Sequence, residues 1–379
     1  MEVQNTFLTG ATGFVGREHL WRLLRAGHRV DCLIRAAGAA AAQSRLDQIL
    51  DAAQPEPLTP AERQRANAVL GDLESENLGL QTVDLDRIAS SVDRIIHGAA
   101  SVDWNLPLDR ARAINLRGTE RVIALAQEAA RRGALKKFDY ISTCHVCGRR
   151  QGRIPEEDLS DSNGFFNSYE QSKFEAESAV RRSGLPYSVY RLSMVVGDSR
   201  TGYASSFKVM YWPLKMLSRG AFKIAPASPD GLIDIVPVDY VCDAIELLSA
   251  APGQQGRTFH LAAGPGRNST IAAILDLAVE LFKIRRPVLI PARLFSVTVR
   301  PFLMLLSSPK QREQMKKGRV YLPYTSFKAE FDTSQVRALT DPAGLAPPPV
   351  ATFFRRLVEY ALATDWGKKS PQSAATMGV

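Results

Sequence analysis

The chain has 379 residues and a formal net charge of +9, with 45% hydrophobic and 23% charged residues. This ordinary globular composition excludes a largely disordered chain and allows one large α/β domain with an appendage, or two domains. The charge is uneven, because residues 290–379 hold thirteen Lys or Arg against six Asp or Glu, a surplus of +7 that leaves +2 for the first 289 residues. The basic excess therefore belongs to the C-terminal region.

The sequence runs from Met1 directly into an apolar strand, without the basic segment and hydrophobic stretch of a secretory signal. We therefore expect a cytoplasmic protein. Cys32, Cys144, Cys147 and Cys242 lie mostly in apolar runs, as reduced core thiols do, and no disulfide is expected. Two further ligands at zinc-finger spacing are missing around Cys144, His145 and Cys147, so we also expect no metal site.

Strand and helix patterns alternate through the first two thirds of the chain, which is typical of a parallel sheet with helices on both faces. The expected strands are residues 3–8, 29–34, 68–70, 94–97, 138–142, 187–192, 233–236 and 258–261. The expected helices are residues 14–26, 109–132, the helix that contains Tyr169, residues 239–248, and a helix capped by Ser269 that ends at Phe282.

Residues 9–16, Thr-Gly-Ala-Thr-Gly-Phe-Val-Gly, place glycines three apart between the first strand and the first helix. A missing Cβ allows a tight turn and lets a pyrophosphate approach the N-terminus of the helix. The alternative is a glycine-rich turn that only packs the helix on the strand, since the spacing differs from G-x-G-x-x-G. The predicted cofactor contacts in this turn are Gly10, Thr12, Gly13, Phe14, Val15 and Gly16.

The second strand ends at Arg35, where NAD-binding folds usually present an acidic residue to the ribose 2′-hydroxyl. A guanidinium pairs with a 2′-phosphate and stacks on adenine, so this position favours NADPH over NADH. Arg45 is a second, weaker candidate for the same phosphate. The alternative for both residues is a solvated surface arginine.

Tyr169 and Lys173 lie one helical turn apart, at i and i+4, in the segment Asn-Ser-Tyr-Glu-Gln-Ser-Lys. An ammonium at this distance favours the ionised phenol and lowers its pKa, which would allow Tyr169 to exchange a proton with a carbonyl oxygen. This spacing is common on helix surfaces. Its interpretation as reduction chemistry depends on the glycine turn that precedes it.

Further motifs follow the glycine turn, and together they resemble the extended short-chain dehydrogenase/reductase family. Within that family they are similar to the thioester-reductase branch, with a male-sterility-type NAD(P)-binding domain, which includes terminal reductase domains of nonribosomal peptide synthetases, carboxylic acid reductases and fatty acyl-CoA reductases. Sugar-nucleotide epimerases share the first motifs but lack Gly-Asp-Ser-Arg-Thr-Gly. The motifs are Gly-Asp-Leu at 71–73, Leu-Gly-Leu at 78–80, His-Gly-Ala-Ala-Ser-Val-Asp-Trp at 97–104, Asn-Leu-Arg-Gly-Thr at 115–119, Ile-Ser-Thr at 141–143, Tyr-Arg-Leu at 190–192, Gly-Asp-Ser-Arg-Thr-Gly at 197–202 and Val-Pro-Val-Asp-Tyr-Val at 236–241.

The resemblance covers residues 3–265 and implies roles for individual positions. Thr143 is the implied hydroxyl donor, which makes Thr143, Tyr169 and Lys173 the expected catalytic residues. The alternatives are a turn residue for Asp72, a buried amide for Asn115, and a β-branched residue that closes a strand for Thr143. The further cofactor contacts that the resemblance implies are Asp72, Leu73, Ala99, Ala100, Ser101, Asn115 and Lys173.

The expected architecture is an α/β fold with a Rossmann-type doubly wound parallel sheet and a smaller, mainly helical C-terminal substrate lobe. We assign residues 1–265 to the NADP-binding domain, interleaved with the substrate lobe from about residue 199. Residues 266–367 form the rest of the lobe, and residues 368–379 form a flexible tail.

The resemblance implies NADPH-dependent reduction of an acyl thioester to an aldehyde or alcohol. Competing interpretations are a reductase or dehydrogenase of a free ketone, aldehyde or alcohol, then a sugar-nucleotide epimerase, and, in another class, a cofactor sensor or scaffold without turnover. No adenylation or carrier segment precedes Met1 in this sequence. The acyl group is therefore expected as an acyl-CoA or on a separately encoded acyl carrier protein.

The basic C-terminal lobe contains an apolar stretch, residues 287–306, that Arg293 and Arg300 divide into pieces too short to span a bilayer. We expect the lobe to cover the acyl chain and to present Lys316, Lys317 and Arg319 to the phosphates of CoA or to an acidic carrier protein. Peripheral contact with an anionic membrane and a merely solubilising surface are the alternatives. No nucleic-acid partner is expected, and the oligomeric state stays open.

Overall fold

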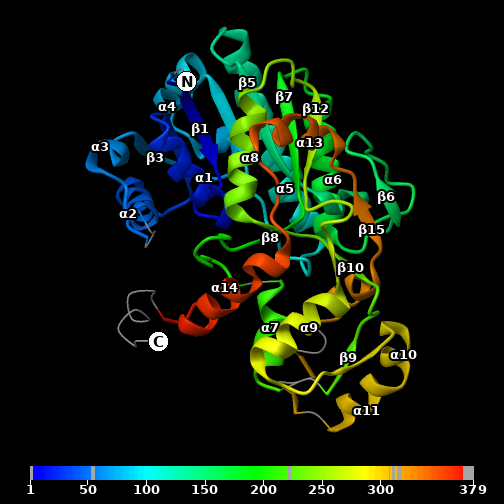
Figure 1. The fold of residues 1–379 in the computed structure, drawn as a ribbon. Coiled ribbons are helices and arrows are strands. Elements are labelled where there is room, and N and C mark those ends of the chain that lie inside the picture. Colours follow the sequence, from blue (N-terminus) through cyan, green and yellow to red (C-terminus); the bar gives the residue numbers. More distant parts are fainter. Residues whose placement is uncertain are drawn as a thin grey trace.

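The computed structural model describes residues 3–369, apart from residues 53–55, 208, 221–222, 307, 310–311 and 314–317. Its centre is a seven-stranded sheet with the strand order β12-β7-β5-β4-β1-β2-β3 (Figure 1). All neighbours are parallel; Leu8 of β1, for example, lies opposite Cys32 of β2 and Ile96 of β4. The predicted α/β class with a Rossmann-type parallel sheet is therefore confirmed.

The strand order reverses between β1 and β4, and ligands of such sheets bind at the carboxyl ends of the strands on either side of this point. Most side chains of the central strands are buried, and all four residues of β4 are, as expected for a sheet that is covered on both faces. The strands are β1 (Asn5–Thr9), β2 (Arg29–Ile34), β3 (Ala66–Leu70), β4 (Arg94–His97), β5 (Lys137–Thr143), β7 (Tyr187–Leu192) and β12 (Arg257–Leu261).

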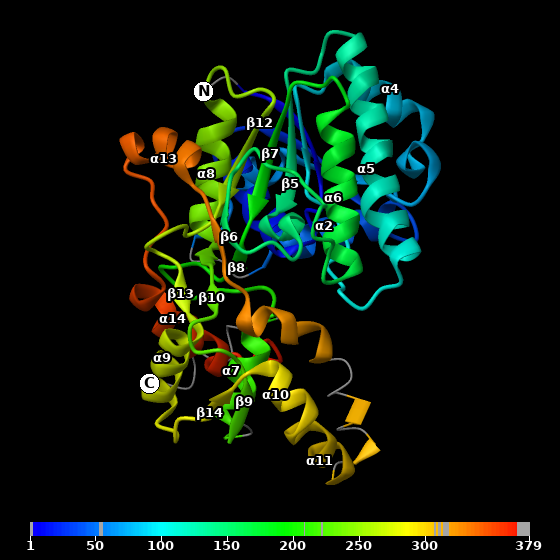
Figure 2. The same ribbon diagram turned by 90° about the vertical axis from the view of Figure 1, so that its right-hand side faces the viewer.

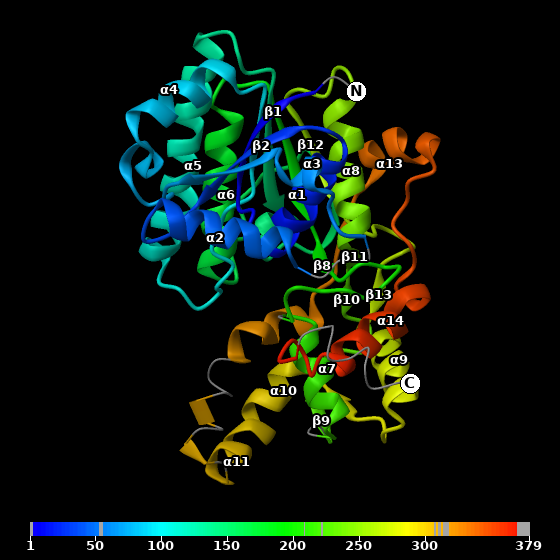
Figure 3. The ribbon, with the colours of Figure 1, turned by 90° about the vertical axis from the view of Figure 1, so that its left-hand side faces the viewer.

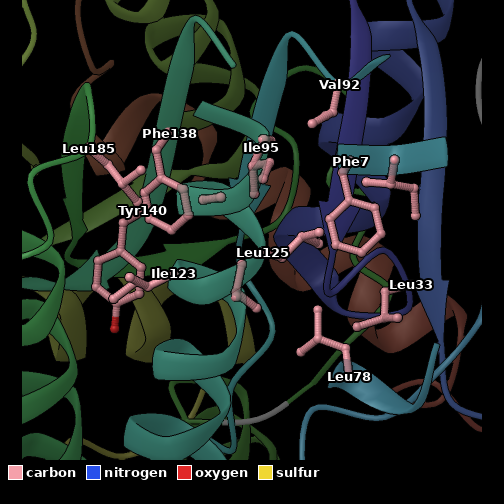
Figure 4. Packing of buried hydrophobic residues seen from close by; sticks show 14 of the residues in the cluster. Phe7, Leu33, Leu78, Val92, Ile95, Ile123, Leu125, Phe138, Tyr140 and Leu185 are labelled. Carbon is pink, nitrogen blue, oxygen red and sulfur yellow. The ribbon is translucent and has the colours of Figure 1, made fainter. Parts of the chain in front are cut away.

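Helices cover both faces of the sheet (Figure 2). One face carries α1 (Phe14–Arg25), α2 (Ala39–Leu50) and α8 (Val238–Ala250), and the other carries α4 (Thr82–Ser91), α5 (Leu108–Arg131) and α6 (Ser168–Arg181). Figure 4 shows the core on the α5 side, where Phe7, Ile95 and Phe138 are fully buried. Burial of one such side chain contributes about 1.5–3 kcal/mol, so this core fixes the strands against the helices.

Two predictions about the segments after β7 are wrong in detail. The expected strand 233–236 is split: β10 (Leu232–Ile233) pairs with β13 (Ser269–Thr270), and β11 (Ile235–Pro237) pairs with β8 (Met194–Val196). Asp234 lies between them, and its carboxylate accepts hydrogen bonds from the backbone N–H groups of Ala263 and Gly264. The cap of α9 (Ile271–Phe282) is Thr270 rather than Ser269, because the Thr270 hydroxyl accepts a hydrogen bond from the Ala273 N–H at 3.1 Å.

A smaller, mainly helical lobe lies beneath the carboxyl edge of the sheet (Figures 1 and 3). It contains α7 (Tyr211–Ser218), α9, α10 (Ala292–Val297), α11 (Val299–Leu306) and α14 (Val350–Ala363), with the short strands β9 (Ile224–Pro226) and β14 (Val288–Ile290) paired in parallel. Within the described ranges, no helix is long and apolar enough to cross a membrane.

Before α14 the chain returns to the sheet domain. The 3₁₀ segment η3 (Gly318–Ser326) leads into β15 (Ala329–Phe331), which pairs with β6 (Gly152–Ile154), and α13 (Ser334–Thr340) packs on α8 and β12. Since η3 contacts α10 of the lobe, while β15 and α13 pack on the sheet domain, this stretch ties the lobe to the sheet domain. The division of the chain near residue 265 stays a prediction.

Candidate active site

The glycine turn between β1 and α1 has the geometry of a phosphate cradle. Gly10 has a φ of +87°, and a Cβ atom placed there would lie 2.7 Å from the backbone nitrogen of Ala99. A Cβ atom on Gly16 would lie 2.1 Å from the carbonyl oxygen of Gly10. Only glycine therefore allows the turn to close against α1 and the end of β4, and this narrow turn at a helix N-terminus fits the pyrophosphate of a dinucleotide.

Asn115 of α5 connects the end of β4 to the helix that carries Tyr169. Its side chain is 1% exposed. The amide oxygen accepts a hydrogen bond from the Ser101 N–H at 2.8 Å, and the amide nitrogen donates to the Ser101 carbonyl at 3.1 Å and to the Ser172 hydroxyl at 2.9 Å. Asn115 is thus a buried amide. It also holds residues 99–101, which the resemblance implies contact the cofactor, beside α6.

The ends of β2 and β3 bring together the residues predicted to bind the adenosine half of the cofactor. The Arg35 side chain is 70% exposed, and its guanidinium lies 3.9 Å from a carboxylate oxygen of Asp72 and 3.7 Å from one of Glu74. The Arg45 guanidinium donates to the carbonyl oxygen of Arg35. Leu73 packs against Gly118 of α5, where an added Cβ atom would lie 3.2 Å from the Leu73 Cβ atom.

Thr143 and Tyr169 meet at the carboxyl end of β5. Thr143 is the last residue of this strand. Its hydroxyl donates to the Leu192 carbonyl at 3.3 Å and lies near enough to the Tyr169 hydroxyl to influence the pKa of that group. Tyr169 is the second residue of α6, which is capped by the Asn167 side chain. Burial raises the pKa of Tyr169 to about 12, and the neighbouring Thr143 side chain opposes this shift.

Lys173 lies one turn further along α6 and is 4% exposed. Its ammonium donates to the Tyr140 hydroxyl at 2.7 Å and to the Ile141 carbonyl at 2.8 Å. Burial lowers the pKa of Lys173 to about 7, an effect that the charge of Glu177 partly opposes. The predicted lowering of the Tyr169 pKa by Lys173 is therefore wrong for this structure, because burial dominates both groups and Lys173 directs its hydrogen bonds to β5.

The sequence interpretation missed the partners of Lys173 on β5. Tyr140 and Ser142 alternate on one face of the strand, opposite Lys173 and Glu177 at i and i+4 on α6. The Ser142 hydroxyl donates to a carboxylate oxygen of Glu177 at 2.7 Å. Residues two apart on a strand lie on one face, as do residues four apart on a helix. This spacing is a signal that could have predicted both pairs.

A second missed residue is Tyr324 of η3, which is far from Tyr169 in the sequence. Its hydroxyl donates to a carboxylate oxygen of Glu170, the residue after Tyr169, although 154 residues separate the two in the sequence. No local spacing could predict this contact. The structure therefore brings Thr143, Tyr169 and Lys173 together beside a residue of the C-terminal lobe, while their contacts with substrate and cofactor stay predictions.

Comparison with known proteins identifies the family. The family model described as male sterility protein matches residues 8–245, which include the glycine turn, the site residues on β5 and α6, and most of α8. The chain belongs to this family. The expected resemblance to the thioester-reductase branch of the extended short-chain dehydrogenase/reductases is thereby confirmed, and the large domain is an NAD(P)-binding domain.

Two relatives and one solved structure place the chain within the male sterility protein family. A linear gramicidin synthase from Brevibacillus parabrevis is 32% identical over 299 residues, which cover 75% of this chain and 6% of the synthase. Carboxylic acid reductase of Mycobacterium marinum is 30% identical over 291 residues, which cover 69% of this chain and 24% of that reductase. The terminal R domain from the myxalamid PKS-NRPS biosynthetic pathway superposes with a TM-score of 0.81 at 26% identity, covering 98% of this chain and 93% of that one. The chain thus spans a small part of these curated relatives and nearly all of the R domain.

Proposed function

We propose that this protein reduces an acyl thioester to an aldehyde or alcohol with NADPH. The observation that carries the proposal is the placement of Thr143 beside Tyr169, with Lys173 one turn away, at the carboxyl edge of the sheet next to the glycine turn. Membership of the male sterility protein family supports it, as does the similarity to a carboxylic acid reductase and to the R domain of a synthase.

The side chains at the end of β5 suit the reduction of a carbonyl group. Bound NADPH supplies the hydride. The hydroxyls of Thr143 and Tyr169 donate hydrogen bonds to the carbonyl oxygen as negative charge develops on it, which stabilises the transition state by several kcal/mol in a buried site. Tyr169 then gives its proton to that oxygen. The resulting hemithioacetal collapses as its C–S bond breaks: the hydroxyl proton leaves with the thiol, and the aldehyde remains. Reduction of the aldehyde to an alcohol would use a second NADPH. Lys173, held by Tyr140 and Ile141, would bind the nicotinamide ribose.

The preference for NADPH is part of the proposal and rests on Arg35. This cation is mostly exposed at the end of β2, and the carboxylates of Asp72 and Glu74 lie 3.9 and 3.7 Å from it, near enough to orient it without forming short ion pairs. A 2′-phosphate would be a stronger partner for the guanidinium.

We also propose a cytoplasmic location, since all four cysteines are free and buried.

The acyl donor is proposed to dock at the basic surface of the lobe. A cavity of about 250 Å³ between α10 and η3 is lined by Arg293, Ser296, Arg319 and Ser326, among others. Neither arginine has an acidic partner within the described part of the chain. The cavity suits the phosphate of a phosphopantetheine group, which CoA and acyl carrier proteins share. Lys316 and Lys317, for which the sequence predicts the same role, lie outside the described residues.

The decisive experiment follows NADPH oxidation with octanoyl-CoA, octanoyl carrier protein, octanal and 2-octanone, and identifies the products. These substrates have the same chain length, so they differ only in the reacting group and the carrier. Turnover of the thioesters supports the proposal. Turnover of 2-octanone alone would make the protein a ketone reductase, and no turnover with tight NADPH binding would favour a cofactor sensor.

A further inference from the structure

Tyr324 of the C-terminal lobe makes a polar contact with the first turn of the proposed catalytic helix. Its hydroxyl donates to a carboxylate oxygen of Glu170 and accepts a hydrogen bond from the Asn167 side-chain amide at 2.7 Å. Both partners belong to the N-terminus of α6, where Asn167 is the cap and Glu170 follows Tyr169. One hydroxyl from the lobe therefore joins two residues that flank the proposed proton donor.

Glu170 in turn holds the backbone that leads into α6. Its side chain is fully buried, and its second carboxylate oxygen accepts a hydrogen bond from the Phe166 N–H at 2.8 Å. Its own N–H donates to the Asn167 side chain at 3.0 Å. Burial raises the pKa of Glu170 to about 7, against the hydrogen bonds from Tyr324 and Phe166 and the charge of Arg149. A carboxylate buried in this way needs each of its few partners.

The ring of Tyr324 packs between segments that adjoin the proposed catalytic residues. Its centroid lies 5.3 Å from the ring of His145, which follows Thr143 by two residues, and 5.3 Å from the ring of Phe166. The Tyr324 ring also lies 4.6 Å from the ring of Trp104, in the loop after β4. These contacts fix the ring, so the hydroxyl has little freedom to leave Glu170.

We propose that Tyr324 is a positioning residue: its hydrogen bond to Glu170 fixes the first turn of α6 and thereby sets Tyr169 against Thr143. The site on the sheet is then completed only when η3 of the lobe is in place. The same segment begins beside the cavity lined by Arg319, so an acyl donor that binds there contacts the element that aligns Tyr169. The catalytic part of this inference rests on the proposed function.

Three variants test the inference. Tyr324→Phe removes the hydroxyl and keeps the ring, and Glu170→Gln removes the carboxylate charge at similar volume. Tyr321→Phe is the matched control, because Tyr321 lies in the same segment with its ring 4.9 Å from that of Trp104, and its hydroxyl makes no hydrogen bond to any described residue. We expect Tyr324→Phe and Glu170→Gln each to lower kcat about tenfold with octanoyl-CoA, with the KM for NADPH unchanged.

The double variant Tyr324→Phe/Glu170→Gln should be no slower than either single variant, since both remove one interaction. If the two effects multiply, or if Tyr324→Phe lowers thermal stability but leaves kcat unchanged, Tyr324 is only a structural contact and the inference is wrong. Tyr321→Phe should behave like the wild type.

Hydrogen exchange provides a readout that needs no substrate. The backbone amide of Phe166 is held by Glu170, so it should exchange faster in Tyr324→Phe than in the wild type or in Tyr321→Phe. Unchanged exchange would overturn the inference even if the protein proves to be a thioester reductase. Faster exchange in a protein that reduces none of the octanoyl substrates would support the link between the lobe and α6, while the proposed function would fail.

Discussion

The polar side chains of the sheet edge and those of the C-terminal lobe differ in burial and in hydrogen bonding. At the sheet edge, Lys173 and Asn115 are buried, and each side chain makes two or more hydrogen bonds to named neighbours. In the lobe, Arg293 and Arg319 are exposed beside a cavity and have no acidic partner among the described residues. The first arrangement fixes atoms in advance, as transition-state stabilisation requires, whereas the second leaves charges available for a partner.

The largest effect should come from the sheet edge, where one oxygen atom carries the proposed proton transfer. Tyr169→Phe should lower turnover by at least about a hundredfold, because the ring remains while the proton donor is lost. NADPH should still bind, as titration of its fluorescence would measure. A folded Tyr169→Phe variant with wild-type turnover would remove Tyr169 from the mechanism and would place the chemistry elsewhere.

Burial of Lys173 at the sheet edge also makes the free energy of unfolding depend on pH. The pKa of Lys173 is about 7 in the folded protein, against 10.5 for an exposed lysine. Between these values the unfolded chain binds more protons than the folded one, so the contribution of Lys173 to stability rises with pH. From about pH 6.5 to about pH 8.5, the wild type should gain about 1–2 kcal/mol relative to Lys173→Met. Urea unfolding of the protein without cofactor at both pH values measures this difference, and parallel curves for the two proteins would contradict it.

The same contrast explains what the sequence could and could not predict. The parallel sheet, the glycine turn and the positions of Thr143, Tyr169 and Lys173 follow from local patterns, because strand period, turn chemistry and helix spacing are short-range properties. The pKa of Tyr169 was predicted with the wrong sign, because burial is set by the whole fold and outweighs one neighbouring charge. Tyr324 could not be found, since its contact with Glu170 depends on where the lobe returns to the sheet.

Arg35 shares a feature with each region: it lies at the sheet edge, like Lys173, but its side chain is mostly exposed, like the arginines of the lobe. Arg35→Asp should weaken NADPH binding about tenfold or more and change NADH binding by less than about twofold, because a 2′-phosphate would lose a cation and face a third carboxylate beside Asp72 and Glu74. Titration of both cofactors measures this. Arg29→Asp, at the opposite end of β2, is the matched control. Equal losses for the two cofactors would show that Arg35 does not distinguish them.

The smallest effect should come from the lobe, where exposed charges attract a partner without fixing its atoms. Reversing Arg293 and Arg319 to Glu together should raise the KM for octanoyl-CoA about threefold at low salt and leave the KM for octanal unchanged. The effect should shrink as salt is added, because ions screen exposed charges over about 10 Å at 0.1 M. Steady-state kinetics at two salt concentrations would measure both trends.

The control for this lobe variant carries the same change in net charge at a distance from the site. Arg29 and Arg182 are exposed at the amino edge of the sheet, and their reversal to Glu should leave both KM values unchanged. If this control variant raises the KM for octanoyl-CoA as much as the lobe variant does, only the total charge matters and the cavity between α10 and η3 is not a dock. If the lobe variant loses octanal turnover as well, the arginines support the fold of η3 and its contact with α6. A selective effect on the thioester would instead separate a region that recognises the carrier from a region that performs the chemistry.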